Sequence, residues 1–251
     1  MEARSVRLTL YLFCGLLGLL LSGLIPNALL GETILLLFCI LPVFYERKRG
    51  ETPFFPFRPC RMLSSLLFFP LLLGVTIGVS ALTALLFPTV VPAARGLSVL
   101  TVLTSAIAPA LAEETLFRFL TLSILLPYGK KRAVVLSAFL FALFHQSLYQ
   151  MPYALAAGVV LGAAALYSNS VTLPVLLHFA NNLLSLLIGA RLTLPLVLIF
   201  VLLGALAAVA LYVINHSQKN TKSVVTPTRA AALFPLSLYA VYCLTMAVLR
   251  L

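Results

Sequence analysis

Two adjacent glutamates and an arginine stand inside an apolar stretch of this sequence, in the order Glu113-Glu114-Thr115-Leu116-Phe117-Arg118. The chain has six acidic residues, all glutamate, and two of them occupy a stretch where lipid is expected. A charge at the middle of a bilayer costs about 2.5–3.5 kcal/mol even on the mildest scales. These ionisable groups therefore need ionic partners, a water-filled cavity or a chemical role.

The spacing of the three ionisable residues predicts different roles for the two glutamates. On a helix, Glu114 and Arg118 lie on one face and can pair, with the acid before the base, which is the more favourable order. Glu113 points about 100° away from Glu114, so its carboxylate is left free. A free carboxylate in a cavity could act as the general base that activates a water molecule. For the Glu114–Arg118 pair taken alone, a purely structural ion pair is the favoured interpretation.

Two later segments carry further polar groups at helical spacing. Phe141 and His145 are four residues apart and share a helix face, and so do His178 and Asn182. An imidazole and a carboxamide on one face offer two hydrogen-bond donors to one point, which suits an oxyanion. The alternatives are a hydrogen-bonded core histidine at position 145 and polar contacts between helices at 178 and 182. Asn181 points elsewhere and is expected to make such an interhelical contact.

The elements that position these residues are membrane spans. The chain has 251 residues, is 62% hydrophobic and only 9% charged, and has a mean hydropathy of +1.13. This composition excludes a soluble domain. We predict an all-α fold, a polytopic transmembrane helical bundle of eight or nine spans, with residues 1–251 forming a single integral membrane domain. The apolar runs are Leu8–Leu24, Leu29–Phe44, Leu63–Phe87, Leu97–Leu126, Ala133–Tyr149, Tyr153–Tyr167, Leu173–Ile188, Leu192–Ile214 and Ala230–Leu249.

The basic residues predict the orientation of the bundle. With a cytoplasmic N-terminus and nine spans, thirteen basic residues fall inside, and only Arg95, Arg191 and Arg250 fall outside. This asymmetry follows the positive-inside rule. The net charge of +11 therefore indicates topology signals and contacts with membrane lipids, and no nucleic-acid partner is expected. The polar stretch His216–Arg229 is predicted to be a loop.

The polar residues fall at similar depths in neighbouring spans. His145 lies ~18 Å along its helix from Ala133, and Glu113 lies ~20 Å from Leu126, at the rise of an α-helix. Together with His178, they could converge on one cavity that opens toward the cytoplasm.

Other routes to peptide hydrolysis require residues that this sequence lacks. The absence of aspartate excludes an aspartyl dyad. Neither HExxH, the zinc-protease helix, nor GxSxG, the serine nucleophile turn, occurs in the chain. Glutamate and histidine remain as the pair that could activate water.

The three patterns, in this order, resemble the motifs EExxxR, FxxxH and HxxxN of the CPBP family, which covers CAAX prenyl endopeptidases and bacteriocin-processing or immunity proteins (also called the Abi family). The resemblance extends over residues 104–187, which would form the motif-bearing catalytic core. It includes the flank Ser170-Val171-Thr172-Leu173-Pro174 that leads into His178. One departure is Phe119, where family members often have glycine after the motif arginine.

The resemblance implies a glutamate-dependent intramembrane endopeptidase. Its substrate would be a peptide or membrane-anchored protein reached from the cytoplasmic side, prenylated if this is a true CAAX enzyme. In a bacterium, where prenylated CAAX substrates are not expected, peptide or bacteriocin processing, self-immunity or another membrane protein is favoured. The small size suggests the bacterial cytoplasmic membrane. No cofactor is expected; zinc is the minor alternative, with Glu113, His145 and His178 as its ligands. The implied roles are water activation by Glu113 and His145, oxyanion stabilisation by His178 and Asn182, and support of the site by Glu114 and Arg118.

A second reading keeps the same cavity without proteolysis. The chain would then be a bacteriocin self-immunity factor or a scaffold in the membrane. The presence of all the motif residues favours the enzyme. A transporter is a weaker third reading because no paired, broken-helix repeats occur.

Overall fold

The computed structural model describes residues 2–50, 55, 63–87, 97–188, 192–217 and 234–249, and their regular structure is entirely helical. Most of these helices begin and end within a few residues of the predicted apolar runs. The long helices are α1 (Glu2–Leu24), α2 (Ala28–Arg49), α3 (Phe68–Leu86), α7 (Lys130–Phe144), α8 (Met151–Ser168), α9 (Thr172–Ile188), α10 (Leu194–Ser217) and α11 (Phe234–Leu249).

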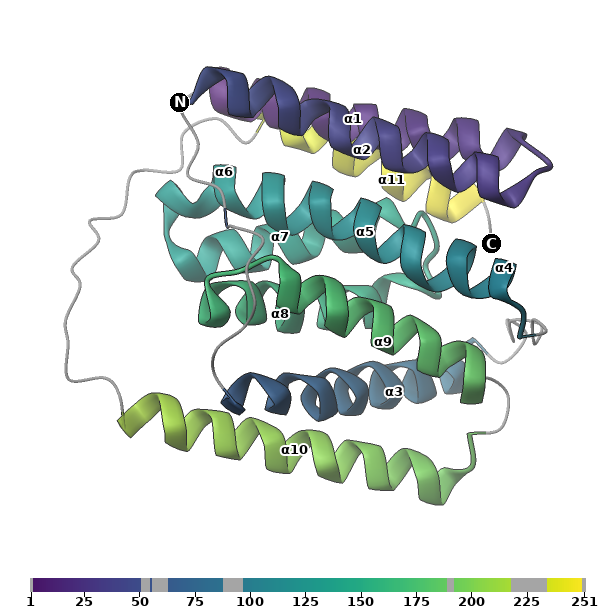
Figure 1. Cartoon of the computed structure of the whole chain (residues 1–251), viewed down its shortest axis with the longest axis vertical. Coiled ribbons are helices and arrows are strands. Elements are labelled where there is room, and N and C mark those ends of the chain that lie inside the picture. Colours follow the sequence, from purple (N-terminus) through teal and green to yellow (C-terminus); the bar gives the residue numbers. More distant parts are fainter. Residues whose placement is uncertain are drawn as a thin grey trace.

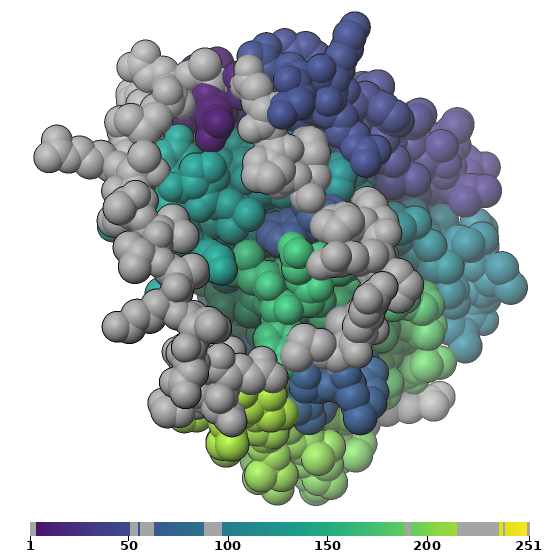
Figure 2. Space-filling model, turned by 60° about the vertical axis from the view of Figure 1, so that its left-hand side comes forward, coloured from purple at the N-terminus to yellow at the C-terminus, as the bar shows by residue number. Residues whose placement is uncertain are grey.

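The helices form a layered bundle (Figure 1). On one side α1 packs against α2 and α11, and on the other side α3 packs against α10. The middle layer holds α5, α7, α8 and α9, with α7 against α8 and α5 against α9. Figure 2 shows one end of the bundle, where atoms of the α8–α9 region lie between α10 and the N-terminal helices α1 and α2. All three motifs therefore belong to the middle layer.

The described helices confirm a polytopic membrane bundle. Six of them are long and apolar enough to cross a bilayer, and Thr172–Ile188 and Tyr239–Leu249 are shorter apolar helices. Many of their large apolar side chains point outward; Leu10 on α1 and Leu202 on α10 are each 60% exposed. Such an apolar exterior is stable when lipid replaces water around the bundle. The chain is therefore an integral membrane protein.

The middle layer contains one long helical run over residues 99–128. It passes through α4 (Val99–Val102), a π-helical turn (Leu103–Ile107), α5 (Ala108–Glu114), a second π-helical segment η3 (Thr115–Leu122), α6 (Ser123–Leu125) and a final 3₁₀ turn. π-Helical turns are rare and are frequent at functional sites. Here the second one begins directly after Glu114.

Two hydroxyl groups satisfy backbone carbonyls in the η3 segment. The Thr121 hydroxyl donates to the carbonyl of Leu116 at 2.7 Å. Ser137, on α7, donates to the carbonyl of Phe117 at 2.9 Å. A carbonyl that a π-helical turn displaces from the regular ladder needs such a donor when it is buried. The Ser137 contact also fixes α7 against the helix that carries the first motif.

Small residues let helices approach closely on the other side of the bundle. A Cβ added at Gly74 of α3 would lie 2.6 Å from the carbonyl oxygen of Phe200, and one added at Gly204 of α10 would lie 2.9 Å from the Cα of Gly74. Such distances leave no room for a side chain, so the α3–α10 contact requires glycine at both positions. Close packing of this kind replaces the hydrophobic effect as a driving force inside a membrane.

Two details of the sequence prediction were wrong. The run Ala133–Tyr149 does not form one helix, because α7 ends at Phe144 and Gln146 adopts a left-handed backbone with φ of 48°. The chain then turns, and α8 begins at Met151 with a proline in its first turn, a position that proline favours. His216 is also not in a loop, because α10 continues to Ser217. The rest of the predicted polar loop lies outside the described residues.

Candidate active site

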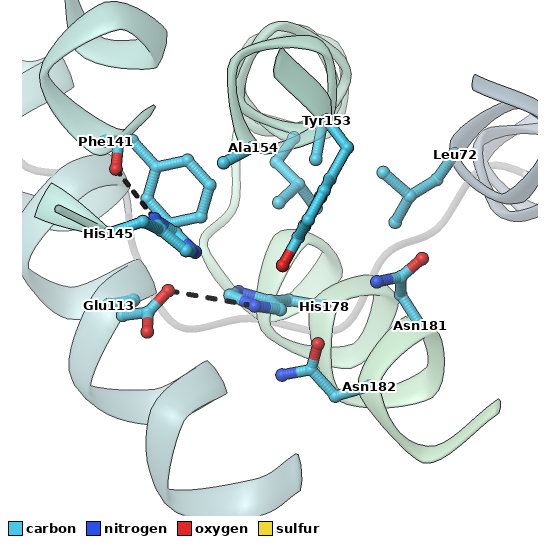
Figure 3. A pocket seen from close by; sticks show the side chains of 11 residues that line it. Leu72, Glu113, Phe141, His145, Tyr153, Ala154, His178, Asn181 and Asn182 are labelled. Carbon is cyan, nitrogen blue, oxygen red and sulfur yellow. Dashed lines mark hydrogen bonds and ion pairs between the residues drawn. The ribbon is translucent and has the colours of Figure 1, made fainter. Parts of the chain in front are cut away.

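A cavity of about 80 Å³ is lined by residues of α3, α5, the end of α7, α8 and α9. Figure 3 shows its polar side chains gathered around one space. This volume is large enough to hold water, since a single water needs about 10–15 Å³ of this kind of space. The residues that line it are Leu72, Glu113, Phe141, His145, Tyr153, Ala154, Ala157, Leu161, His178, Asn181 and Asn182.

Two of the predicted site residues, Glu114 and Arg118, lie behind the cavity wall. Arg118 Nη1 is 3.1 Å from Glu114 Oε1, and both side chains have an exposed fraction of 0%. This is the i, i+4 ion pair that the spacing predicts, formed across the start of the π-helical segment. A buried pair of opposite charges costs less than either charge alone, so each residue holds the other in place.

The guanidinium of Arg118 has two further contacts. Its Nη2 donates to the backbone carbonyl of Gly158 on α8 at 3.3 Å. Its Cζ lies 4.4 Å from the centroid of the Phe141 ring, a cation–π distance. Arg118 therefore joins the first-motif helix to α7 and α8. The absence of a side chain at Gly158 lets α8 approach α7 closely, because a Cβ there would lie 2.9 Å from the Cα of Ala138.

His178 joins the first and third motifs. Its Nδ1 lies 2.8 Å from Glu114 Oε1, the same oxygen that faces Arg118. A carboxylate only accepts, so Nδ1 carries the proton and donates. The other ring nitrogen, Nε2, is directed to the cavity, where Glu113 Oε2 lies 3.8 Å away. Glu114 thus determines which edge of the His178 ring reaches the cavity.

His145, at the end of α7, also uses Nδ1 for a hydrogen bond away from the cavity. Its Nδ1 lies 3.0 Å from the backbone carbonyl of Phe141. A carbonyl cannot donate, so Nδ1 carries the hydrogen, and in the neutral ring the Nε2 is left as an acceptor. The ring packs edge-on against Phe141, with centroids 4.9 Å apart, and against Tyr153 at 6.3 Å. This fixed ring can accept a hydrogen bond from a water in the cavity.

The two neighbouring asparagines of α9 both line the cavity but differ in their contacts. The Thr76 hydroxyl of α3 donates to Asn181 Oδ1 at 3.0 Å. Asn181 therefore makes the interhelical contact that its position predicts, although it also reaches the cavity edge. Asn182 lies beside His178 in Figure 3, one helical turn further along the same face.

The structure thus places Glu113, His145, His178 and Asn182 at one cavity, with the Glu114–Arg118 pair directly behind it. Tyr153 and Leu72 also line it, and the sequence reasoning missed both. Leu72 lies on α3, far from the motifs, and no local pattern marks it. Tyr153 had one available signal, a hydroxyl group in an otherwise apolar run between the second and third motifs.

The zinc alternative finds no built site in the described part of the chain. No three histidine, cysteine or glutamate side chains there are arranged to hold a metal ion. Of the three proposed ligands, His178 uses Nδ1 for Glu114 and His145 uses Nδ1 for a carbonyl. The Nε2 atoms of both rings and the Glu113 carboxylate face the cavity, and histidines that bind a metal ordinarily donate their other N–H in this way.

The fold and the cavity define a class: a polytopic helical membrane protein with a buried Glu–His–His–Asn site. Residues 95–184 match the family described as type II CAAX prenyl endopeptidase Rce1-like. This segment contains all three motifs and confirms the resemblance to CPBP proteins. No match to the chain was found among curated proteins or among solved structures.

Proposed function

We propose that this protein is an intramembrane endopeptidase that hydrolyses a peptide bond with a water activated by Glu113. The observation that carries the proposal is the state of that carboxylate. Glu113 Oε2 is buried, makes no hydrogen bond within the described residues and lines a cavity large enough for water. Leaving a buried carboxylate oxygen without a hydrogen bond is costly, and a water in the cavity would supply one.

The first step is the attack of this water. Glu113 takes one proton from the water as its oxygen adds to the carbonyl carbon of the peptide bond. His145 Nε2 accepts a hydrogen bond from the second hydrogen of the water and so orients it. Figure 3 supports this role, because the His145 ring lies beside Glu113 on the cavity wall.

The second step is the stabilisation of the negative charge on the former carbonyl oxygen. His178 and Asn182, four residues apart on α9, present an imidazole edge and an amide toward the same space. Donors that are already in position in a site of low polarity stabilise such a charge strongly. For His178 to donate, Nε2 must carry a proton. Since Nδ1 already donates to Glu114, the donating ring is then an imidazolium next to the Glu114 carboxylate and the newly protonated Glu113.

The third step is the collapse of the tetrahedral intermediate. The carbon–nitrogen bond breaks, and Glu113 returns the proton to the leaving amine. The products are a carboxylic acid and an amine, which become a carboxylate and an ammonium by proton exchange, and Glu113 is again a carboxylate. Glu114 and Arg118 touch no reacting atom in this scheme. They hold the His178 ring and the α7–α8 contact, and are therefore positioning residues.

The apolar helices that surround the site support a substrate that is itself associated with the membrane. We propose a membrane-associated or lipid-modified peptide or protein, with prenylated CAAX-type peptides as the first class to test. The basic ends of α2 and α7 lie at the same end of the bundle as the N-terminus (Figure 1). By the positive-inside rule this end is cytoplasmic, as expected in a bacterial cytoplasmic membrane. We propose that hydrolysis needs no metal cofactor.

The direct test is cleavage of a farnesylated CAAX peptide by the purified protein in lipid nanodiscs. Glu113→Gln keeps the size of the side chain but removes the base, and we expect turnover to fall about 10³-fold. Glu32→Gln, the same change on α2 away from the cavity, is the matched control and keeps turnover. Equal turnover by wild type and Glu113→Gln would disprove the role of Glu113.

A second measurement covers substrates of other chemistry. Membrane peptides from cells expressing the wild-type chain and the Glu113→Gln variant are compared by mass spectrometry. New termini that require Glu113 establish proteolysis and identify a substrate. Identical profiles from folded, equally abundant proteins, with no cleavage in nanodiscs, would favour a non-proteolytic immunity factor or scaffold. Full activity after chelation, with no metal by elemental analysis, would support the metal-free mechanism, and activity restored only by zinc would contradict it.

A further inference from the structure

We infer that Tyr153 is a further catalytic residue, whose hydroxyl donates a hydrogen bond to the oxyanion from the side of the cavity opposite α9. The inference rests on the proposed endopeptidase function. Tyr153 lies in the first turn of α8 and lines the same cavity as His178 and Asn182. In Figure 3 its hydroxyl points toward the His178 ring and the space in front of it.

The Tyr153 hydroxyl has no hydrogen bond within the described residues, in contrast to the hydroxyls of three other tyrosines of this bundle. The Tyr11 hydroxyl donates to Glu46 at 2.9 Å, and that of Tyr239 donates to the Leu140 carbonyl at 3.2 Å. The Tyr167 hydroxyl pairs with Ser64 at 2.6 Å. A tyrosine whose ring is packed among apolar groups ordinarily finds a partner for its hydroxyl. The open donor of Tyr153 points to a group that arrives with the substrate.

The position of the ring is fixed, although the hydroxyl is free. The Tyr153 ring packs edge-on against His145, with centroids 6.3 Å apart and an interplanar angle of 79°. The other cavity residues from α8 are Ala154, Ala157 and Leu161. Tyr153 is therefore the one polar side chain that this helix contributes among the residues lining the cavity. A donor held in this way costs little reorganisation when charge develops.

The chemistry of the phenol favours a donor over a base. A phenol keeps its proton at neutral pH and can both donate and accept. Glu113 already supplies a base for the water, and His145 accepts from it. What a tetrahedral oxyanion requires is donors from more than one direction, and His178 and Asn182 both come from α9. Tyr153 completes the set from α8, across the cavity.

The test is Tyr153→Phe, which removes the hydroxyl and keeps the ring against His145. We expect kcat to fall about 10²-fold with KM changed by less than about twofold, because the lost bond forms only in the transition state. The matched control is Tyr167→Phe on the same helix. It loses the hydrogen bond to Ser64, so we expect a lower thermal unfolding midpoint but an unchanged kcat.

Each outcome separates this inference from the proposed function. If wild type and Glu113→Gln differ in turnover but Tyr153→Phe equals wild type, Tyr153 is not catalytic and the endopeptidase stands. If the wild type shows no turnover that depends on Glu113, in nanodiscs or in cells, the proposed function fails and this inference fails with it. If kcat of Tyr153→Phe falls about 10²-fold while its unfolding midpoint equals that of wild type, the chemical role of the hydroxyl is established.

A binding measurement distinguishes an oxyanion donor from a residue that only orders the site. A phosphinic analogue of the cleaved peptide carries a tetrahedral anion in place of the scissile bond. We expect Tyr153→Phe to bind this analogue about 10²-fold more weakly than wild type does, matching its loss in kcat. The affinity for the uncleaved peptide is measured in a protein that also carries Glu113→Gln, so that the peptide is not hydrolysed. We expect Tyr153→Phe not to change that affinity. Equal loss of affinity for both ligands would overturn the inference.

Discussion

The Nδ1 of His178 lies 2.8 Å from Glu114 Oε1, so the first and third motifs are joined by a direct hydrogen bond across 64 residues of sequence. The same oxygen faces Arg118 Nη1 at 3.1 Å. A carboxylate oxygen has lone pairs enough for both contacts. The second glutamate of the pair is therefore shared between an ion pair on its own helix and the orientation of a histidine on another.

The Glu114 contacts predict a large loss of stability for Glu114→Ala. This change leaves the buried Arg118 guanidinium without its carboxylate, and breaking a buried ion pair on one side costs about 3–5 kcal/mol. Denaturant unfolding in detergent micelles measures this loss. Glu114→Gln should lose less, because its amide oxygen can still accept from His178. The matched change Glu113→Ala should alter turnover far more than stability, and equal unfolding of the Glu114→Ala and wild-type proteins would contradict the structure.

The two asparagines of α9 should separate chemistry from packing. Asn182→Ala removes a proposed oxyanion donor, and we expect kcat to fall about 10²-fold with little change in unfolding. Asn181→Ala loses the 3.0 Å hydrogen bond from Thr76 of α3, at a cost of about 1 kcal/mol in unfolding free energy. Turnover assays and thermal unfolding on both variants check this. If Asn182→Ala instead abolished folding, its role would be structural.

The hydroxyl of Ser137 should be required for stability. Ser137→Ala removes the donor to the Phe117 carbonyl in the π-helical segment η3 and leaves a buried acceptor unpaired, which costs about 1–3 kcal/mol. Ser123→Ala is the control, because the Ser123 hydroxyl is buried and has no hydrogen bond in the described part of the chain. We expect that variant to unfold like the wild type or at a higher temperature. The reverse order of the two unfolding midpoints would show that the π-helical segment does not need Ser137.

The close contact of α8 with α7 should not tolerate a methyl group at Gly158. A Cβ there would lie 2.9 Å from the Cα of Ala138 and would displace the carbonyl that Arg118 contacts. We expect a loss of about 1–3 kcal/mol, as for other overpacked sites. Gly23→Ala on α1 is the control, since nothing lies within 4 Å of its added Cβ. It should be neutral or slightly stabilising, because alanine has a higher helix propensity than glycine.

Helical periodicity predicted the contacts that lie within one span. The Glu114–Arg118 pair and the shared face of Phe141 and His145 follow from i, i+4 spacing alone. The apolar runs also placed most helix boundaries. These features depend on neighbours in sequence, which is why a single chain without its fold reveals them.

The contacts between spans could not be predicted in the same way. The hydrogen bond of Thr76 to Asn181 and the place of Tyr153 at the cavity depend on how α3, α8 and α9 pack. The π-helical segments change the register of the first-motif helix, and an i→i+5 ladder has no recognised sequence signal. The early end of α7 depends on the positive φ of Gln146. Glutamine seldom adopts a positive φ, so its presence in the sequence does not predict this turn. Tertiary packing decides each of these features.

The Glu114–Arg118 pair also bears on how the chain enters the bilayer. An isolated arginine at the bilayer centre costs about 2.5–3.5 kcal/mol on the scale measured for insertion of helices. Because Glu114 and Arg118 lie on one helix, their charges can neutralise each other as soon as that helix forms. This neutralisation requires no contact from α8 or α9, which are synthesised later. The segment over residues 99–128 could therefore leave the translocation machinery with this pair already neutralised and acquire the contacts to Gly158 and His178 only during assembly.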